Sequence, residues 1–174
     1  MSTKVAAIAI VISLIISALL INAGSQGSIV VNGWPLFALC APIAFLLHWT
    51  FFIPSYILRT DHYFDLIGST SYVATAITAA MLSPSLDLRG IIICSMVVIW
   101  ATRLGLFLFT RIKQDGKDGR LDVIKTKFIL FLNLWTIGGL WVLVTMGAGL
   151  AAMTSKTSLE IGLIGFIGIG LWVF

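Results

Sequence analysis

Charge is scarce in this sequence. Asp, Glu, Lys and Arg together make up 10% of its 174 residues, whereas hydrophobic residues make up 59%. A soluble domain carries roughly 25% charged residues, and so few polar side chains cannot cover a globule of this size. The composition therefore excludes an ordinary soluble domain and indicates a protein whose solvent is lipid. The net charge of +4 gathers in one loop on an apolar body, so we expect no nucleic-acid partner.

Cysteine and the common catalytic motifs are scarce as well. Cys40 and Cys94 both lie in apolar runs, so we interpret them as small buried residues and expect no disulfide and no metal site. The sequence has no Walker A motif, no GxGxxG after a strand, no HExxH and no GxSxG. These absences argue against the familiar nucleotide-binding folds, zinc peptidases and serine hydrolases.

Long uncharged apolar runs are what the sequence has in abundance. A helix needs about 20 mostly apolar residues to span a bilayer, and five runs meet this need: Val5–Ile21, Pro35–Leu58, Leu66–Leu82, Gly90–Thr110 and Phe128–Met153. The runs are continuous and lack the alternation of barrel strands, and a helix satisfies its own backbone hydrogen bonds in lipid. We therefore predict an all-α, polytopic transmembrane helical bundle, with five complete spans in a single domain over residues 1–174.

The first and last apolar runs each allow a second interpretation. The first is longer than the roughly 7–15 residues of a signal-peptide core, so we expect a retained helix rather than a cleaved leader. The last begins at Leu159 and is still apolar at Phe174. As a helix it rises only about 24 Å, and a terminal carboxylate in hydrocarbon is costly. We expect a truncated sixth span; the alternative is a short last helix whose carboxylate reaches the outer headgroups.

Basic residues mark one face of the membrane. With the N-terminus inside, the inside segments hold eight of the eleven Lys and Arg residues, and the outside segments hold two, Arg89 and Lys156. Positive residues concentrate in cytoplasmic loops, so we expect the N-terminus and the loop at residues 111–127 to be cytoplasmic. That loop holds six of the eight: Arg111, Lys113, Lys117, Arg120, Lys125 and Lys127.

The 111–127 loop, RIKQDGKDGRLDVIKTK, and Arg103 are the first candidates for a binding site. Gly116 and Gly119 let the loop turn tightly, so that its cations and backbone N–H groups could clamp phosphates. A solvated positive-inside loop with internal ion pairs, or a site for anionic lipid, explains the same charge. Arg103 lies inside the fourth span, where a charge indicates function, although it is close enough to the headgroups to snorkel. Trp100 shares its helical face.

A second polar cluster, RTDHYFD at residues 59–65, lies on the same side. His62 could supply acid–base chemistry, since the pKa of histidine is about 6.5, but carboxylates beside an Arg are more typical of a salt-bridged loop. His48 lies inside the second span next to Trp49. We interpret His48 first as a packing residue, and second as a residue that faces a cavity.

Three strings, in this order, resemble one family: HYFDLIGSTSY, WATRLGLFLFTRIKQDGKDGRLDVIKTKF and FLNLWTIGGLWV. Their most specific element is Trp-x-x-Arg-Leu at residues 100–104, followed by Arg111 and by GKDGRLD at residues 116–122. On these residues the tract from Tyr63 to Met153 resembles the bacterial membrane proteins of the steroid 5-alpha-reductase-like superfamily, of the DUF1295 type, represented by their N-terminal part.

The resemblance implies a membrane-embedded, NADPH-dependent reductase of a conjugated carbon–carbon double bond in a lipid-like substrate, located in the bacterial inner membrane. Hydride would pass to the electrophilic carbon while an acid, not identified by the sequence, stabilises the developing enolate. Arg or Lys at a 2′-phosphate is the usual means of choosing NADPH over NADH. The resemblance assigns cofactor binding, with weaker support from Trp100 and Asp65, to Arg103, Lys117, Asp118, Arg120 and Asp122.

The sequence departs from the resemblance at two places. An Arg-His-Pro-Asn-Tyr type segment that helps enclose the cofactor in related proteins does not occur up to Phe174, so we expect part of a site and no activity from this chain alone. Related sequences often carry Gln near the fifth-span tryptophans, where this chain has Gly138-Gly139. Two other interpretations stay open: a non-enzymatic integral membrane protein that binds anionic lipid, and an enzyme similar to the isoprenyl-cysteine methyltransferases, which use S-adenosylmethionine.

Overall fold

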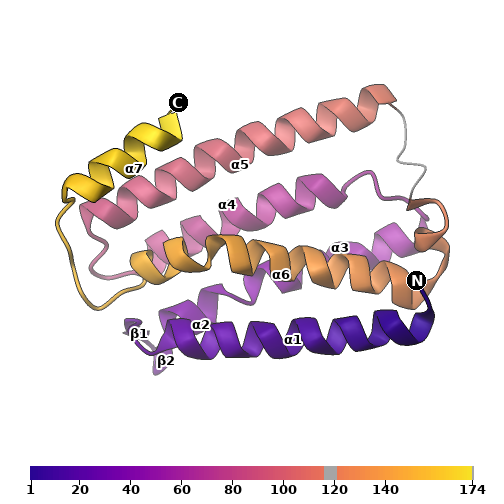
Figure 1. The fold of residues 1–174 in the computed structure, drawn as a ribbon, viewed down its shortest axis with the longest axis horizontal. Coiled ribbons are helices and arrows are strands. Elements are labelled where there is room, and N and C mark those ends of the chain that lie inside the picture. Colours follow the sequence, from indigo (N-terminus) through magenta and orange to yellow (C-terminus); the bar gives the residue numbers. More distant parts are fainter. Residues whose placement is uncertain (116–120, 174) are drawn as a thin grey trace.

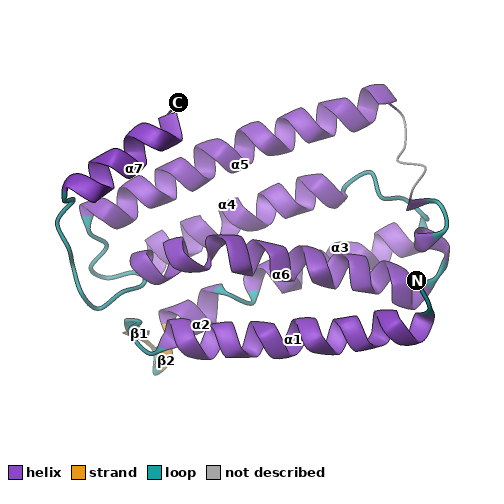
Figure 2. Ribbon diagram, in the orientation of Figure 1, coloured by secondary structure: helices purple, strands orange, loops and turns teal. Residues whose placement is uncertain are grey.

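The fold is a bundle of helices in a computed structural model that describes residues 1–115 and 121–173, with side chains described outside 113–120. Helices make up most of the chain (Figure 2), and the long ones run side by side in alternating directions (Figure 1). The predicted all-α bundle is confirmed. In chain order the elements are α1 (Thr3–Ser25), β1 (Val30–Val31), β2 (Trp34–Pro35), α2 (Leu36–Cys40), α3 (Ile43–Ile57), α4 (Phe64–Leu82), α5 (Leu88–Asp115), a 3-10 turn (Ile124–Thr126), α6 (Phe128–Met153) and α7 (Leu163–Val173).

Four segments of the described chain are helical, long enough and apolar enough to cross a bilayer: Thr3–Ser25, Leu36–Ile57, Leu88–Ile112 and Phe128–Met153. They correspond to the first, second, fourth and fifth predicted spans, and they make the chain an integral membrane protein. The second is α2 followed by α3, interrupted before Ile43 where Pro42 provides no backbone N–H.

The third predicted span lies in α4, which has 19 residues but does not belong to that group of four. Its buried face mixes apolar residues with Ser69, Ser71 and Thr75, and α4 packs against α3, α5 and α6. The sixth predicted run forms only α7, whose 11 residues are too few for an upright span of about 20. In Figure 1, α7 lies beside the beginning of α5.

The connections gather at the two ends of the bundle (Figure 1). One end, here called the loop end, holds the N-terminus, the connection from α3 to α4 and the connection from α5 to α6. The other end holds the β1–β2 hairpin, the connection from α4 to α5 and the segment before α7. Charge is segregated accordingly: the loop end holds Lys4, Arg59, Arg111, Lys125 and Lys127, and the opposite end holds Arg89 and Lys156.

The buried core lies along α6, in one cluster shared with α2, α3, α4 and α5 and in a second shared with α3 and α4. The largest fully buried side chains there include Trp135 and Phe131 of α6. Close backbone approach needs glycine: a Cβ on Gly105 of α5 would lie 2.7 Å from the Cβ of Ser69 on α4. This approach brings α4 and α5 close together at Ser69, a residue that lines a cavity.

Candidate functional site

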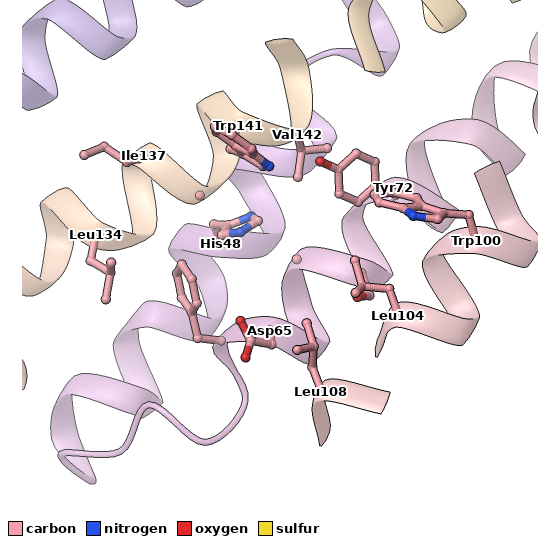
Figure 3. A pocket seen from close by; sticks show the side chains of 14 residues that line it. His48, Asp65, Tyr72, Trp100, Leu104, Leu108, Leu134, Ile137, Trp141 and Val142 are labelled. Atoms are coloured by element: carbon pink, nitrogen blue, oxygen red, sulfur yellow. The ribbon is translucent and has the colours of Figure 1, made fainter. Parts of the chain in front are cut away.

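A cavity of about 380 Å³ lies between α3, α4, α5 and α6 (Figure 3). Its wall is mostly apolar, and the polar side chains on it are few. Its lining residues are His48, Phe64, Asp65, Gly68, Ser69, Tyr72, Trp100, Leu104, Leu108, Leu134, Ile137, Gly138, Trp141 and Val142. An apolar chamber with a small number of polar groups is the usual form of a small-molecule site.

Helical spacing explains why these residues share one cavity. On α4, Asp65, Ser69 and Tyr72 are separated by four and three residues, so all three lie on one face. On α5, Trp100 and Leu104 are likewise four apart, followed by Leu108, and on α6 the lining residues recur from Leu134 to Val142 at the same intervals. Three stripes therefore face a common centre, and α3 contributes a single residue, His48.

His48 is 1% exposed and its hydrogen bonds define its tautomer. Its Nδ1 lies 2.7 Å from the carbonyl oxygen of Ala44; a carbonyl only accepts, so Nδ1 carries the hydrogen. The hydroxyl of Ser71 lies 3.4 Å from the same nitrogen but donates to the carbonyl of Ile67 at 2.7 Å. The interpretation of His48 as a packed residue is confirmed, and the residue lines the cavity as well.

Gly138 makes the room that the His48 ring occupies. A Cβ at this position would lie 2.7 Å from both Cδ2 and Nε2 of His48, and 3.1 Å from Phe64. The ring edge of His48 also faces Trp135, with ring centroids 6.0 Å apart. The Gly138-Gly139 pair, seen in the sequence as a departure from related proteins, therefore admits an imidazole at the wall of the cavity.

Tyr72 and Trp100 form the part of the wall shared by α4 and α5 (Figure 3). Their rings meet edge to face with centroids 5.0 Å apart. The Tyr72 hydroxyl is hydrogen-bonded to Thr145 of α6, whose own hydroxyl donates to the carbonyl of Trp141 at 2.7 Å. Because threonine has one hydroxyl hydrogen, Tyr72 donates to Thr145 in this arrangement.

Arg103 lies on the outside of α5 rather than in the cavity. It is exposed and lines a separate groove of about 330 Å³ with Trp100, Leu104 and Phe107. The predicted sharing of one face by Trp100 and Arg103 is thus present. Trp100 and Leu104 border both spaces, so these two side chains connect the groove of Arg103 with the cavity.

A polar pocket of about 350 Å³ lies at the loop end, lined by Leu58, Arg59, Thr60, Asp61, His62, Tyr63, Ile112 and Lys125. Lys125 lies 2.7 Å from Asp122 and 3.4 Å from Asp61. The hydrogen bond to Asp122 and the charge of Asp61 outweigh partial burial and raise the pKa of Lys125. The 59–65 cluster thus contains a salt bridge, as expected, and its cation comes from the basic loop.

The backbone conformation at Arg59 turns the chain so that the residues after it line the pocket. Arg59 has a φ of 50°, in the left-handed region where glycine usually ends a helix. The N–H of Arg59 donates to the carbonyl of Tyr56, and the N–H of Thr60 donates to the carbonyl of Ser55. This is the Schellman pattern, which ends α3. The chain then turns directly into the residues that line the pocket.

The two predicted cofactor residues whose side chains the structure describes, Arg103 and Asp122, do not lie together. Arg103 lies on the outer face of α5, and Asp122 pairs with Lys125 at the loop end. Lys117, Asp118 and Arg120 lie outside the described residues. Of the weaker candidates, Trp100 and Asp65 both line the cavity.

Tyr72 and Gly138 were missed from the sequence as cavity residues. The signal for Tyr72 was its spacing of seven from Asp65 on a helix of unusual polarity. For Gly138 the sequence held no signal, because the His48 ring that it admits comes from another helix.

A family model described as "Protein of unknown function (DUF1295)" matches residues 51–174, well over half of the chain. The matched region includes α4, α5 and α6, and with them all the lining residues of the cavity except His48. No curated protein and no solved structure matches the chain.

Proposed function

Because the chain belongs to the DUF1295 family of proteins of unknown function, its chemistry must come from its own residues, and we propose that it is a membrane-embedded reductase. In this proposal the cavity takes up a lipid-like substrate, and NADPH is the reductant of a conjugated carbon–carbon double bond in it. The observation that supports this most is the mostly apolar cavity with a phenol, a carboxylate and an imidazole on its wall.

The cavity suits a substrate drawn from lipid. Its volume of about 380 Å³ lies within the roughly 300–1,000 Å³ of small-molecule sites. Its apolar walls would bind hydrocarbon and exclude water from the reacting carbons. A single polar group on such a substrate would be oriented by a hydrogen bond to one of the few polar side chains on the wall.

Tyr72 is the best acid for this reaction. NADPH, when bound, would supply a hydride. Negative charge then develops on the carbonyl oxygen conjugated to the double bond, and the Tyr72 hydroxyl can donate a hydrogen bond and then its proton to that oxygen. The Tyr72 proton is held by Thr145 without substrate. If the Thr145 hydroxyl rotated toward Tyr72, Thr145 would become the donor and Tyr72 the acceptor. The phenol hydrogen of Tyr72 would then be free to point at the substrate.

Basic groups near the cavity fit a cofactor that carries phosphates. The loop end offers a polar pocket with Arg59, His62 and Lys125 on its wall, and cations with hydroxyl and N–H donors are what phosphate oxygens require. We assign NADPH binding to Lys117, Asp118 and Arg120 together with Arg103 and Asp122. Since Asp122 is paired with Lys125 at 2.7 Å, its role would be to hold that ammonium group in place.

The same proposal includes a location. A cytoplasmic loop end would meet the cellular pool of NADPH, and the excess of basic residues at that end favours this orientation. The chain would then lie in a bacterial inner membrane, with membrane lipid as its solvent and partner. The N-terminus and residues 111–127 would be in the cytoplasm; the predicted loop is shorter than expected, because Arg111 to Asp115 form the end of α5.

The test is NADPH binding, followed by NADPH oxidation with a long-chain conjugated enone. Both would be measured on detergent-solubilised protein that extends to the stop codon of its gene. We expect saturable binding of NADPH and oxidation that depends on the enone. Protein that binds S-adenosylmethionine instead would support the methyltransferase interpretation, and protein that binds neither but associates with anionic vesicles would support the lipid-binding one.

A further inference from the structure

His48 presents an unused hydrogen-bond acceptor to the cavity. Its Nδ1–H is committed to Ala44, so in the neutral ring Nε2 carries a lone pair. Among the described residues no donor is bonded to Nε2. The residue is 1% exposed and lines the cavity, and Nε2 is not among the fully buried side-chain atoms that lack a partner, so the acceptor stays accessible to a molecule in the cavity.

The surroundings of the ring favour the neutral form. Phe64 and Trp135 meet the ring edge to face, with centroids 6.1 and 6.0 Å away. Asp65 lines the same cavity and has an interaction of its own. Charging an imidazole inside a membrane span is costly, and the one N–H that the neutral ring possesses is already placed.

We propose that the His48 wall of the cavity is a subsite for a hydroxyl group, so that the ligand is an apolar molecule carrying an alcohol. A ligand that fills the cavity without donating to Nε2 would leave this acceptor unpaired, which costs free energy, and a ligand hydroxyl avoids that cost by donating to Nε2. An ammonium group would also donate, but it would bring a full charge out of water into a mostly apolar cavity. This inference rests on the proposed function only in taking the cavity as the ligand site.

Gly138 belongs to the same proposed hydroxyl subsite. A side chain there would collide with Nε2 and Cδ2 of His48 at 2.7 Å, so the glycine keeps the acceptor in its place against α6. Tyr72 lies on another part of the wall (Figure 3), which leaves that phenol to the carbonyl of the substrate and His48 to its hydroxyl. The chain would therefore distinguish hydroxylated enones from plain ones.

The experiment compares two probes that differ in one donor: dodecanol brominated at its far end, and the methyl ether of the same molecule. Bromine quenches tryptophan emission on contact, and Trp100 and Trp141 line the cavity. Quenching that saturates and is reversed by unbrominated dodecanol reports the cavity rather than the surrounding detergent or lipid. The wild-type protein should bind the alcohol roughly 3- to 10-fold more tightly than the ether, the effect of one net hydrogen bond.

Two substitutions of His48 test whether its Nε2 accepts the hydrogen bond from the ligand hydroxyl. His48→Phe removes the acceptor and should bring the ratio of the two affinities close to one while the ether still binds. His48→Gln retains an acceptor at similar reach and should keep part of the preference. Trp49→Phe is the matched control, since Trp49 is adjacent on α3 but donates to Thr136 and does not line the cavity.

Three outcomes would overturn the inference: equal affinity of the wild-type protein for both probes, a preference that survives in His48→Phe, or no saturable binding of either probe. Equal affinities in the wild-type protein would overturn the inference even if one variant does not fold, and His48→Gln provides a second test of the acceptor. A preference for the alcohol in a protein that never oxidises NADPH with any hydroxylated enone would instead remove the proposed reductase function and leave the hydroxyl subsite in place.

Discussion

At the scale of single residues, the proposed chemistry depends on Tyr72. Tyr72→Phe removes one oxygen from a wall that is otherwise retained, so enone binding should stay within a fewfold of wild type. Turnover should fall by roughly 100-fold or more, the usual contribution of a general acid. Steady-state NADPH oxidation and probe binding measured on the same preparation separate the two effects.

Tyr56→Phe is the matched control for that substitution. The Tyr56 ring packs against Phe52 and Phe128, with centroids 5.8 and 5.2 Å apart, and does not line the cavity. Its loss of a phenol should leave turnover unchanged. Equal rates for Tyr72→Phe and wild type would show that another group donates the proton.

Arg120 carries the second prediction at this scale. Arg120→Ala should weaken NADPH binding severalfold and leave the fold intact, because it removes one charged partner of a phosphate. Equilibrium titration of NADPH, together with the thermal unfolding midpoint, measures both. The control is Lys156→Ala, a cation at the opposite end of the bundle. An unchanged NADPH affinity in Arg120→Ala would exclude this loop residue from the cofactor site.

At the scale of helices, Asp87 holds the beginning of α5 and the segment before α7 together. Its carboxylate accepts hydrogen bonds from the N–H of Gly90 at 2.8 Å and from the N–H of Leu159 at 3.2 Å. Partial burial alone would raise its pKa, but these bonds, the Arg89 charge and the Ser158 hydroxyl outweigh burial and lower the pKa of Asp87. The Gly90 contact is an N-terminal cap for α5.

A lowered pKa gives this contact a definite pH dependence. The carboxylate stabilises the folded state above its unfolded pKa of about 3.9, and the stabilisation is lost as pH falls from there through the lower folded value. Asp87→Ala should therefore cost about 1 kcal/mol of stability at pH 7 and much less at the acidic end. Thermal unfolding in detergent across that range measures the difference, and an equal difference at every pH would contradict the assignment.

How far the elements could be predicted depended on what defines their ends. The predicted Phe128–Met153 span coincides with α6, because its limits are set by polar residues on either side. The predicted Pro35–Leu58 span is divided by Pro42, and the Asn32-Gly33 turn before it has φ angles of 51° and 84°, typical of a two-residue hairpin. Both features depend on a few local residues rather than on hydropathy.

The candidate site was less predictable than the helices. Asp65 and Trp100 were predicted from the resemblance as weaker candidates, and both line the cavity. The subsite at His48 requires α3 to bring an imidazole against Gly138 of α6, ninety residues later in the chain. Apolar runs locate the long helices along the chain, but they do not say which faces meet, and the cavity exists only where four faces meet.

At the scale of the whole molecule, the segregation of cations between the two ends makes a prediction about topology. Lys127→Cys and Lys156→Cys place one thiol at each end of the bundle, in a chain whose Cys40 and Cys94 are replaced by Ala. A membrane-impermeant maleimide should label Lys156→Cys in intact cells and should label Lys127→Cys only after the inner membrane is opened.

Labelling in the reverse order would place the loop end outside the cell, away from the NADPH pool, and would exclude the reductase as proposed while leaving the cavity and its hydroxyl subsite intact. Labelling of both positions in intact cells would show mixed orientations, and the bias of basic residues would then be insufficient to orient the chain. Labelling in the expected order would place the polar pocket of Arg59, Asp61 and Lys125 on the cytoplasmic side, where NADPH is supplied. The cofactor would then reach the four helices around the cavity from water, and the substrate would reach them from lipid.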